Sequence, residues 1–413
     1  MAENGTLYFI AKSEHYHAPL GHGFPGYELV NRARALGIPN ATNNNTRGHI
    51  TRLLEEELVR RAAGIGRDER IRLDRRLASG RAGMLNRVLN LETGSLAAEA
   101  ALKMLLARFY RHQADSPKPK YEGRVPVVVV MGDYAGGVRA NYHGTTVLAQ
   151  VMRGLWGALR EGLDSHNEFV VRGVRPNHRV ELEWVFDEFE KSPYKIAGFV
   201  HEFVLMNYGA VRLDERFVKT AYALCTKHDV PVVADEIQTG VWSPRTFMFH
   251  EYGVRPTIVT VGKGFPGGEY PASRILFGAE LDTLPQFGSL VTNGQEELSS
   301  LAYLITMRWT EANADVTAAV GNYYEERLRE LSIRHAQIIR AVEGRRHLAG
   351  IHFHRSKAAK TFAASCTAAG LDISVSPPKP GCPPAVLTKL PLIAGYEAID
   401  AVLDRMEQAV RTC

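Results

Sequence analysis

Apolar and polar positions follow two alternating patterns along the middle of the chain. Short runs rich in β-branched residues recur at 125–131, 196–204, 230–237, 257–262 and 274–279. Amphipathic stretches with apolar residues at helical spacing lie between several of them, at 96–112, 180–189 and 213–228. Strands that alternate with helices predict βαβ units and a mostly parallel sheet. The uninterrupted apolar run at 125–131 is typical of a strand buried on both faces.

The two ends of the chain show other patterns. A helix rich in Leu and Glu is predicted at 49–63, and a long helical stretch at 313–344. After it we predict a strand at 348–353, a helix, a Pro/Gly-rich loop at 377–384, a strand at 385–390 and a final helix at 397–411. We therefore predict a large α/β domain with a smaller α+β domain. The predicted division is an N-terminal part of the small domain at 1–63, the large domain at 64–312 and the C-terminal small domain at 313–413.

Composition narrows the class of protein. Of 413 residues, 45% are hydrophobic and 23% charged, which excludes wholesale disorder. The longest apolar run has seven residues, whereas a membrane span needs roughly twenty, so we expect no membrane contact. The N-terminus lacks the plan of a signal peptide, and four scattered cysteines predict reduced thiols and a cytoplasmic protein. The net charge of +5 is spread along the chain, so nucleic acid is not an expected partner.

The segment 230–240 carries the clearest chemical pattern. An apolar strand runs directly into Asp235 and Glu236, followed by Ile-Gln-Thr-Gly. Ligands of α/β sheets bind at the carboxyl ends of the strands, so these carboxylates are candidate functional groups. A solvated strand end remains the alternative.

Another predicted strand ends at Lys263, between Gly262 and Gly264. The glycines allow a sharp turn and leave room beside the lysine. A lysine in an apolar site has a depressed pKa and can attack a carbonyl to form a Schiff base. A surface lysine is one alternative; a phosphate-binding loop is another, but Gly264 stands where that motif needs Ser or Thr.

Two further segments can contact a ligand. At 93–103 a turn of small residues opens a helix, and free N–H groups at such an end bind phosphate, although Thr93 or Ser95 can equally be an ordinary cap. At 141–146, Tyr142 and His143 precede a glycine turn. Tyr142 could stack on a flat ligand or pack at a domain edge.

Together these motifs resemble the class III aminotransferases over about residues 43–310. The signature is Asp235-Glu-Ile-Gln-Thr-Gly240 with Lys263 following 28 residues after Asp235. The resemblance implies pyridoxal 5'-phosphate (PLP) as cofactor and fold type I. That fold has a large domain with a mixed, mostly parallel seven-stranded sheet and a smaller α+β domain built from both termini.

The resemblance also implies residue roles. Lys263 would bond to the cofactor and move the substrate's α-proton, and Asp235 would keep the pyridine nitrogen protonated, which makes the ring an electron sink. Gln238 would bond the phenolic oxygen of the ring. The residues assigned to the cofactor are Gly94, Ser95, Tyr142, His143, Glu202, Asp235, Ile237, Gln238, Lys263 and Thr292. Family members reach a hydroxyl across a dimer interface, so Thr292 implies a homodimer with shared active sites.

Departures from the family pattern bear on the substrate. Leu96 and Ala98 replace two polar residues of the usual helix-opening motif, and Phe203, not proline, follows Glu202. Many members that use glutamate carry an arginine before a Pro-Pro-Leu, and the stretch 386–392 has only Lys389. Lysine cannot reproduce the two parallel bonds of arginine to a carboxylate.

We therefore predict weak use of glutamate and 2-oxoglutarate, unless Arg47, Lys389 or Arg274 replaces the missing contact. Arg47 is the preferred candidate, because its Asn-rich loop is expected to approach the site. Three N-terminal histidines, His15, His17 and His22, lack the partners of a metal site, so no metal is predicted.

The predicted function is a PLP-dependent aminotransferase that moves an amino group from an amine or amino acid to a keto acid or aldehyde. An epimerase, aminomutase or decarboxylase on the same scaffold is the main alternative, because such relatives share all these motifs. A non-catalytic cofactor-binding protein is disfavoured by Lys263, Asp235 and Gln238. A doubly wound nucleotide-binding protein would need a GxGxxG motif after an early strand, which is not found.

Overall fold

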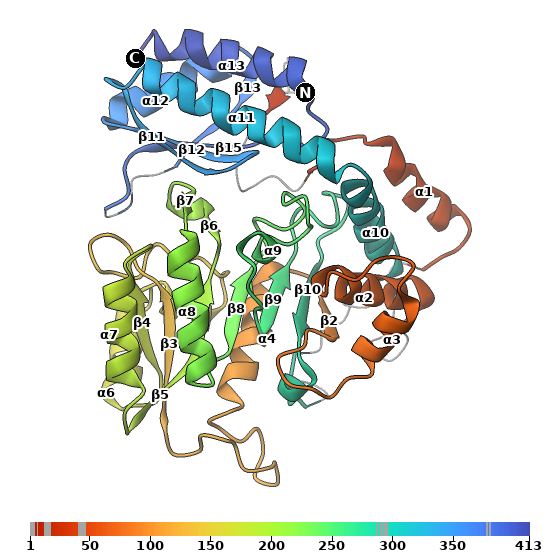
Figure 1. The fold of residues 1–413 in the computed structure, drawn as a ribbon, viewed down its shortest axis with the longest axis vertical. Helices are drawn as coiled ribbons and strands as arrows, with labels where there is room; N and C mark the ends of the chain where they lie inside the picture. The colour runs from red at the N-terminus through yellow and green to blue at the C-terminus, as the bar shows by residue number, and fades with distance from the viewer. Residues whose placement is uncertain are drawn as a thin grey trace.

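The computed structural model describes residues 5, 7–11, 18–39, 47–285, 288–289, 291, 296–376, 379 and 381–413. Figure 1 shows a large unit around a central sheet and a smaller unit stacked beyond one end of that sheet. The smaller unit contains the C-terminal quarter of the chain, with both termini beside it. None of the described helices combines the length and apolarity that crossing a bilayer requires.

Seven strands form the central sheet, as predicted, in the order β2-β10-β9-β8-β5-β3-β4. Their bounds are β2 Arg87–Leu91, β3 Val125–Met131, β4 Val170–Val174, β5 Tyr194–His201, β8 Val232–Asp235, β9 Ile258–Val261 and β10 Ser273–Phe277. The strand β10 runs antiparallel to both its neighbours, and the pairs from β9 to β4 are parallel. The edge strands β2 and β4 were not among the predicted runs.

Helices cover both faces of this sheet. Their bounds are α4 Gly94–Leu106, α5 Val147–Met152, α6 Gly157–Ser165, α7 Arg179–Phe189, α8 Glu215–Lys227 and α9 Phe249–Tyr252. Along β3 the side chains of Val128 and Val130 pack in the cluster of α4, whereas Val127 and Val129 pack in the cluster of α7 and α8. This alternation is the pleat of a strand buried on both faces, as its continuous apolar run predicts.

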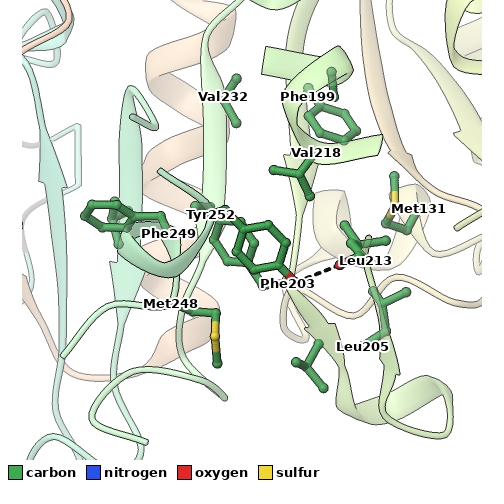
Figure 2. Packing of buried hydrophobic residues seen from close by; sticks show 14 of the residues in the cluster. Met131, Phe199, Phe203, Leu205, Leu213, Val218, Val232, Met248, Phe249 and Tyr252 are labelled. Atoms are coloured by element: carbon green, nitrogen blue, oxygen red, sulfur yellow. Dashed lines mark hydrogen bonds between the residues drawn. The ribbon is translucent and has the colours of Figure 1, made fainter. Parts of the chain in front are cut away.

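Aromatic residues fill the core on the α8 face (Figure 2). The ring of Phe203 stacks on that of Tyr252 with centroids 4.8 Å apart. The Tyr252 hydroxyl donates a hydrogen bond of 2.6 Å to the carbonyl oxygen of Leu213. Burying one such side chain stabilises the fold by about 1.5–3 kcal/mol. Phe203, which stands where the family usually has proline, is fully buried in this core directly beside Glu202.

The smaller unit is an antiparallel sheet covered by helices. Its strands follow the order β11-β12-β15-β14, with β11 Ile339–Arg345, β12 Leu348–Phe353, β14 Ser374–Ser376 and β15 Ala385–Lys389. Its helices are α11 Ala314–Arg334, α12 Ser356–Ala368 and α13 Tyr396–Val410. Near the N-terminus, β1 (Phe9–Ile10) pairs with β13 (Leu371–Asp372), so both ends of the chain contribute to this unit.

The prediction of helix up to residue 344 is wrong at its end. The helix α11 ends at Arg334, and β11 begins at Ile339 and pairs with β12. Gly344 has a φ of 105°, and a Cβ there would lie 2.1 Å from the carbonyl oxygen of Leu348. Pairing with β12 therefore overrides the helix propensity of this charged stretch.

The remaining described elements lie outside the two main sheets and the helices given above. They are η1 Pro25–Tyr27, α1 Glu28–Ala35, α2 His49–Ala62, α3 Arg70–Leu77, β6 Val204–Leu205, η2 Met206–Tyr208, β7 Val211–Arg212, η3 Ala279–Leu281 and α10 Glu297–Ala312. The helix α2 packs against α10, and its Leu54 and Leu58 belong to the core cluster of the large unit. The division at residues 63 and 312 stays a prediction.

Candidate active site

A cavity of about 470 Å³ opens where β5, β8 and β9 end. Nine of the ten residues predicted to bind the cofactor line it: Gly94, Ser95, Tyr142, His143, Glu202, Asp235, Ile237, Gln238 and Lys263. The tenth, Thr292, lies outside the described residues. Residues as far apart in the chain as Gly94 and Lys263 therefore meet at the edge of the sheet where parallel strands bind ligands.

Asp235 is the last residue of β8 and is 4% exposed. Its Oδ2 lies 2.7 Å from Nδ1 of His143. Its Oδ1 accepts hydrogen bonds from Oγ1 of Thr260 at 2.9 Å and from the backbone N–H of Ile237 at 3.1 Å. None of these described partners is a lysine or arginine. The carboxylate is thus held rigidly, and its charge is directed at a buried cavity.

The bond to Asp235 also sets the tautomer of His143. A carboxylate accepts hydrogen bonds, so Nδ1 of the ring carries the proton. The other ring nitrogen, Nε2, is buried and has no hydrogen-bond partner among the described residues. His143 is 3% exposed and lines the cavity, so its ring is shielded from solvent there.

Lys263 follows β9 in a strained backbone conformation. Its φ is +42°, in the left-handed region that costs a non-glycine residue roughly 1–2 kcal/mol. The next residue, Gly264, has no room for a side chain, because a Cβ there would lie 2.3 Å from the ring of Trp242. Strain of this kind persists where surrounding structure fixes the backbone, as happens at functional sites. Here it directs Lys263 into the cavity that Asp235 also lines.

The start of α4 forms the wall of the cavity that suits an anion. Thr93 is the N-cap, and its Oγ1 accepts a hydrogen bond of 3.4 Å from the N–H of Leu96. The N–H groups of Gly94 and Ser95 belong to the first turn, which has no intrahelical acceptors, and they carry the positive end of the helix dipole. Thr93 is therefore an ordinary cap, and the free N–H groups of the same turn are still available to bind a phosphate.

Two glycines bring other chain segments against this helix start. A Cβ on Gly94 would lie 2.6 Å from Cδ1 of Ile237. Gly144 has a φ of +111°, and a Cβ there would lie 2.7 Å from Cα of Ser95. Both contacts are closer than real Cβ atoms allow, so larger residues would push apart the walls that contain Ile237 and Tyr142.

Tyr142 has a cationic neighbour on its ring. The guanidinium of Arg153 lies 4.6 Å from the ring centroid. Such a contact stabilises by about 0.5–1 kcal/mol at exposed sites and fixes the orientation of the ring. The ring of Tyr142 lines the cavity, so it is available to stack on a flat ligand.

Glu236, the second carboxylate of the Asp-Glu pair, points into the core and does not line the cavity. Its Oε1 accepts a hydrogen bond of 2.9 Å from the N–H of Phe249, and Thr239 donates to Oε2. Burial raises the pKa of Glu236 to about 8. Of the two carboxylates that the sequence proposed as functional groups, only Asp235 faces the cavity.

The cavity also contains residues that no motif predicted. Glu92 and Tyr270 line it, and Thr260 supports Asp235 from the neighbouring strand. His201 lies at the end of β5, where burial lowers its pKa to about 4. Thr260 could have been found from its position near the end of a predicted strand, but Glu92 and Tyr270 carry no such signal.

The candidate substrate residues do not line the cavity. Arg47 forms an ion pair of 2.9 Å with Glu55, and its side chain is 46% exposed. Arg274 is 1% exposed and donates to backbone and serine oxygens in the core. Lys389 is also buried, with its Nζ 3.2 Å from Oε1 of Gln238. Of the three N-terminal histidines, His15 and His17 lie outside the described residues.

The residues around the cavity fit a cofactor with a phosphate and a pyridine ring. The start of α4 suits the phosphate, and the close approaches at Gly94 and Gly144 form a cradle that side chains would fill. Asp235 has no described cationic partner, so it can pair with a protonated ring nitrogen. Lys263 supplies an amine in the same cavity.

Comparison with known proteins agrees with this geometry. The family described as Aminotransferase class-III matches residues 57–410. An ornithine aminotransferase of Exiguobacterium sp. is 27% identical over 323 residues, which cover 76% of this chain and 74% of that protein. An ornithine aminotransferase of Schizosaccharomyces pombe is 29% identical over 201 residues, 47% of this chain and 42% of that protein.

A solved structure shows the same fold. The ornithine aminotransferase of Plasmodium yoelii superposes with a TM-score of 0.75 at 18% identity, covering 99% of this chain and 90% of that chain. At this identity the likeness shows the fold, which is fold type I, and not the substrate. The alignment to the Schizosaccharomyces pombe relative spans about two fifths of that protein's length.

Proposed function

The chain belongs to the class III aminotransferases, and on this basis we propose that it transfers an amino group from an amine or amino acid to a keto acid or aldehyde. Enzymes of this family depend on PLP, and the cavity residues fit that cofactor. When bound, PLP withdraws electrons from the carbon that carries the substrate's amino group. One observation carries the proposal: Lys263, Asp235 and the start of α4 line a single cavity.

Each residue contributes a distinct physical task. The N–H groups of Gly94 and Ser95 bind the phosphate, and Tyr142 and Ile237 supply apolar surface for the ring. The carboxylate of Asp235, held by Thr260 and His143, keeps a proton on the ring nitrogen.

Lys263 has two tasks in this proposal. Its Nζ would hold the cofactor covalently and would accept the proton from the substrate carbon. The backbone of Lys263, with its φ of +42° between Gly262 and Gly264, fixes where this side chain enters the cavity. The lysine therefore provides both the covalent link and the base.

The charges of the cavity support a preference among substrates. Its described lining contains three carboxylates, on Glu92, Glu202 and Asp235, but Lys263 is the one cationic side chain. Arg47 and Lys389 contact other groups. We therefore propose that donors with a neutral or cationic end react faster than glutamate. Losing a bidentate arginine contact lowers the affinity for a carboxylate by roughly ten- to a hundredfold.

We further propose a homodimer located in the cytoplasm. Exposed apolar side chains follow Tyr142 along the chain, on Val147, Leu155, Trp156 and Leu159. A second copy of the chain, related by twofold symmetry, would cover them. Sedimentation equilibrium at micromolar concentration checks the dimer, and a fully active monomer would exclude it. The four cysteines are free, which is compatible with a reducing compartment.

A half-reaction screen tests the proposed function. Protein loaded with PLP is mixed with a panel of amines and amino acids, and the change in the cofactor's visible absorption band is followed. Wild type should convert with some donors, and pyruvate or 2-oxoglutarate should restore the band. The Lys263→Ala variant should show no conversion. Racemised, rearranged or decarboxylated product without amino transfer would show that the scaffold performs a different reaction.

A further inference from the structure

Lys389 is a buried lysine at the boundary between the two units. It is the last residue of β15 in the smaller sheet and is 2% exposed. Its neighbours along the chain, Thr388 and Leu390, are fully buried. Moving an ammonium group out of water costs several kcal/mol unless polar or aromatic groups replace its hydration. The groups that contact the Lys389 amine therefore indicate its role in the protein.

Two described contacts of Nζ come from a single loop of the large unit. The amine donates to Oε1 of Gln238 at 3.2 Å, and it lies 3.9 Å from the centroid of the Trp242 ring. The indole N–H of Trp242 donates to the carbonyl oxygen of Leu390 at 3.0 Å. Lys389 and Leu390, at the end of β15, therefore both contact the loop that follows β8. These contacts fix the distance from Lys389 to Gln238.

The charge of Lys389 determines which way the amide of Gln238 faces. An ammonium group has only donors, so it must be met by the amide oxygen and not by the amide NH₂. Gln238 itself lines the cavity and is 4% exposed. With Oε1 turned to Lys389, the NH₂ of Gln238 is left to donate to a ligand.

We propose that Lys389 is a positioning residue that holds the NH₂ of Gln238 toward the cavity, where it donates to an acceptor oxygen on the cofactor ring. This inference rests on the proposed function, because the acceptor belongs to PLP. The smaller unit thereby sets the orientation of a cofactor-binding side chain in the larger one. Lys389 acts through Gln238 and not as the substrate contact suggested by its position in the sequence.

The test replaces Lys389 by Met, which keeps the stem volume and removes the donors. Without the ammonium the amide can rotate, and the ring oxygen loses its donor for part of the time. We expect PLP to dissociate with a three- to tenfold larger Kd, the range for one hydrogen bond. The pH midpoint of the cofactor's absorption band should move upward, because an oxygen that loses a donor keeps its proton to higher pH.

A double-mutant cycle separates positioning from general destabilisation. In a Gln238→Ala background, Lys389→Met should change neither the Kd nor the pH midpoint further. Lys195→Met is the matched control, because Lys195 is 5% exposed and donates to Glu190 at the other end of the sheet. That variant should lower the melting temperature and leave both cofactor readouts unchanged.

The outcomes separate this inference from the proposed function. Wild-type protein that binds PLP, together with a Lys389→Met variant that matches it in Kd and pH midpoint, would overturn the role of Lys389 alone. Additive effects in the cycle would also overturn it. If Lys389→Met fails to fold, the Lys389→Gln variant is used instead. The glutamine side chain is shorter, so its amide can donate to Gln238 only weakly. This variant should shift the Kd and the pH midpoint in the same direction by a smaller amount. Wild-type protein that binds no PLP would overturn both proposals.

Discussion

The two ends of β8 each carry an aspartate that accepts three hydrogen bonds, but their surroundings differ. Asp229, before the strand, bonds to Lys120 at 2.7 Å and also to Arg108 and Tyr121. Asp235, at the end of the strand, bonds to Thr260, His143 and the backbone. The side chain of Asp229 is 52% exposed and that of Asp235 is 6% exposed.

This comparison shows what distinguishes a functional carboxylate from a structural one. The charge of Asp229 is balanced by Lys120, by Arg108 and by solvent, so this carboxylate needs no further cation. The charge of Asp235 is buried with described partners that are neutral or titratable, so it can still pair with a cation that enters the cavity. Electrostatic contacts are also stronger where water is excluded. We infer that the two carboxylates will respond very differently to the same substitution.

Asp235→Asn is expected to have the largest effect. An amide keeps the shape but removes the charge that holds a proton on the ring nitrogen. We expect turnover to fall by about 10²–10³-fold, the range for losing one preorganised electrostatic group. Steady-state rates, with circular dichroism to confirm the fold, measure this. A variant that turns over within a few-fold of wild type would show that Asp235 is not the partner of the ring.

Thr260→Val should have a smaller effect at the same end of the strand. Valine preserves the β-branched shape of a fully buried residue on β9 and removes the donor to Oδ1 of Asp235. Loss of one hydrogen bond to a charged group costs roughly 1.5–3 kcal/mol, part of which we expect to appear as about a tenfold lower turnover. Unchanged kinetics in a folded variant would mean that His143 and the backbone suffice to hold Asp235.

The pH dependence of stability tests the burial of Glu236, next to Asp235. Its pKa is raised from 4.5 to about 8, so the folded protein holds a proton that the unfolded chain releases between these values. Stability contributed by this proton falls as pH rises through that window, by at most about 1.4 kcal/mol per pH unit. Urea unfolding at pH 6, 7 and 8 should show a shallower decline for Glu236→Gln. An equally steep decline in the variant would assign the proton to another group.

Asp229→Asn is expected to have the smallest effect. The group is half-exposed, and exposed ion pairs contribute about 0–1 kcal/mol. Turnover should stay within twofold of wild type, and the melting temperature should fall by only a few degrees. A loss of activity comparable to that of Asp235→Asn would remove the distinction between the two ends of the strand.

The sequence predicted the centre of this site better than its periphery. Asp235, Gln238 and Lys263 follow strands with strong apolar patterns, so their shared edge was predictable before any coordinates. Glu92 and Tyr270 line the cavity because of tertiary packing, and no local sequence motif marks them.

The same limit explains where the predicted fold was wrong and why the surroundings of the candidate substrate residues could not be predicted. The strand β11 carries helix-forming residues and is fixed by its pairing with β12. The edge strand β2 is only partly buried over its first three residues and contains Arg87 and Asn90, so it has no continuous apolar run. Lys389 was one candidate for the substrate contact, and only the structure shows that its amine bonds to Gln238, a residue that lines the cavity, while Lys389 itself does not line it.

The most direct test of this account is to locate the covalent link to the cofactor. The protein loaded with PLP is reduced with borohydride and digested, and the peptides are identified by mass spectrometry. We predict that the reduced cofactor is found on the peptide that contains Lys263, and not on those that contain Lys120, Lys195 or Lys389. Label on one of those other lysines, or no label on any peptide, would contradict the assignment of the active site to the end of the sheet that carries Asp235.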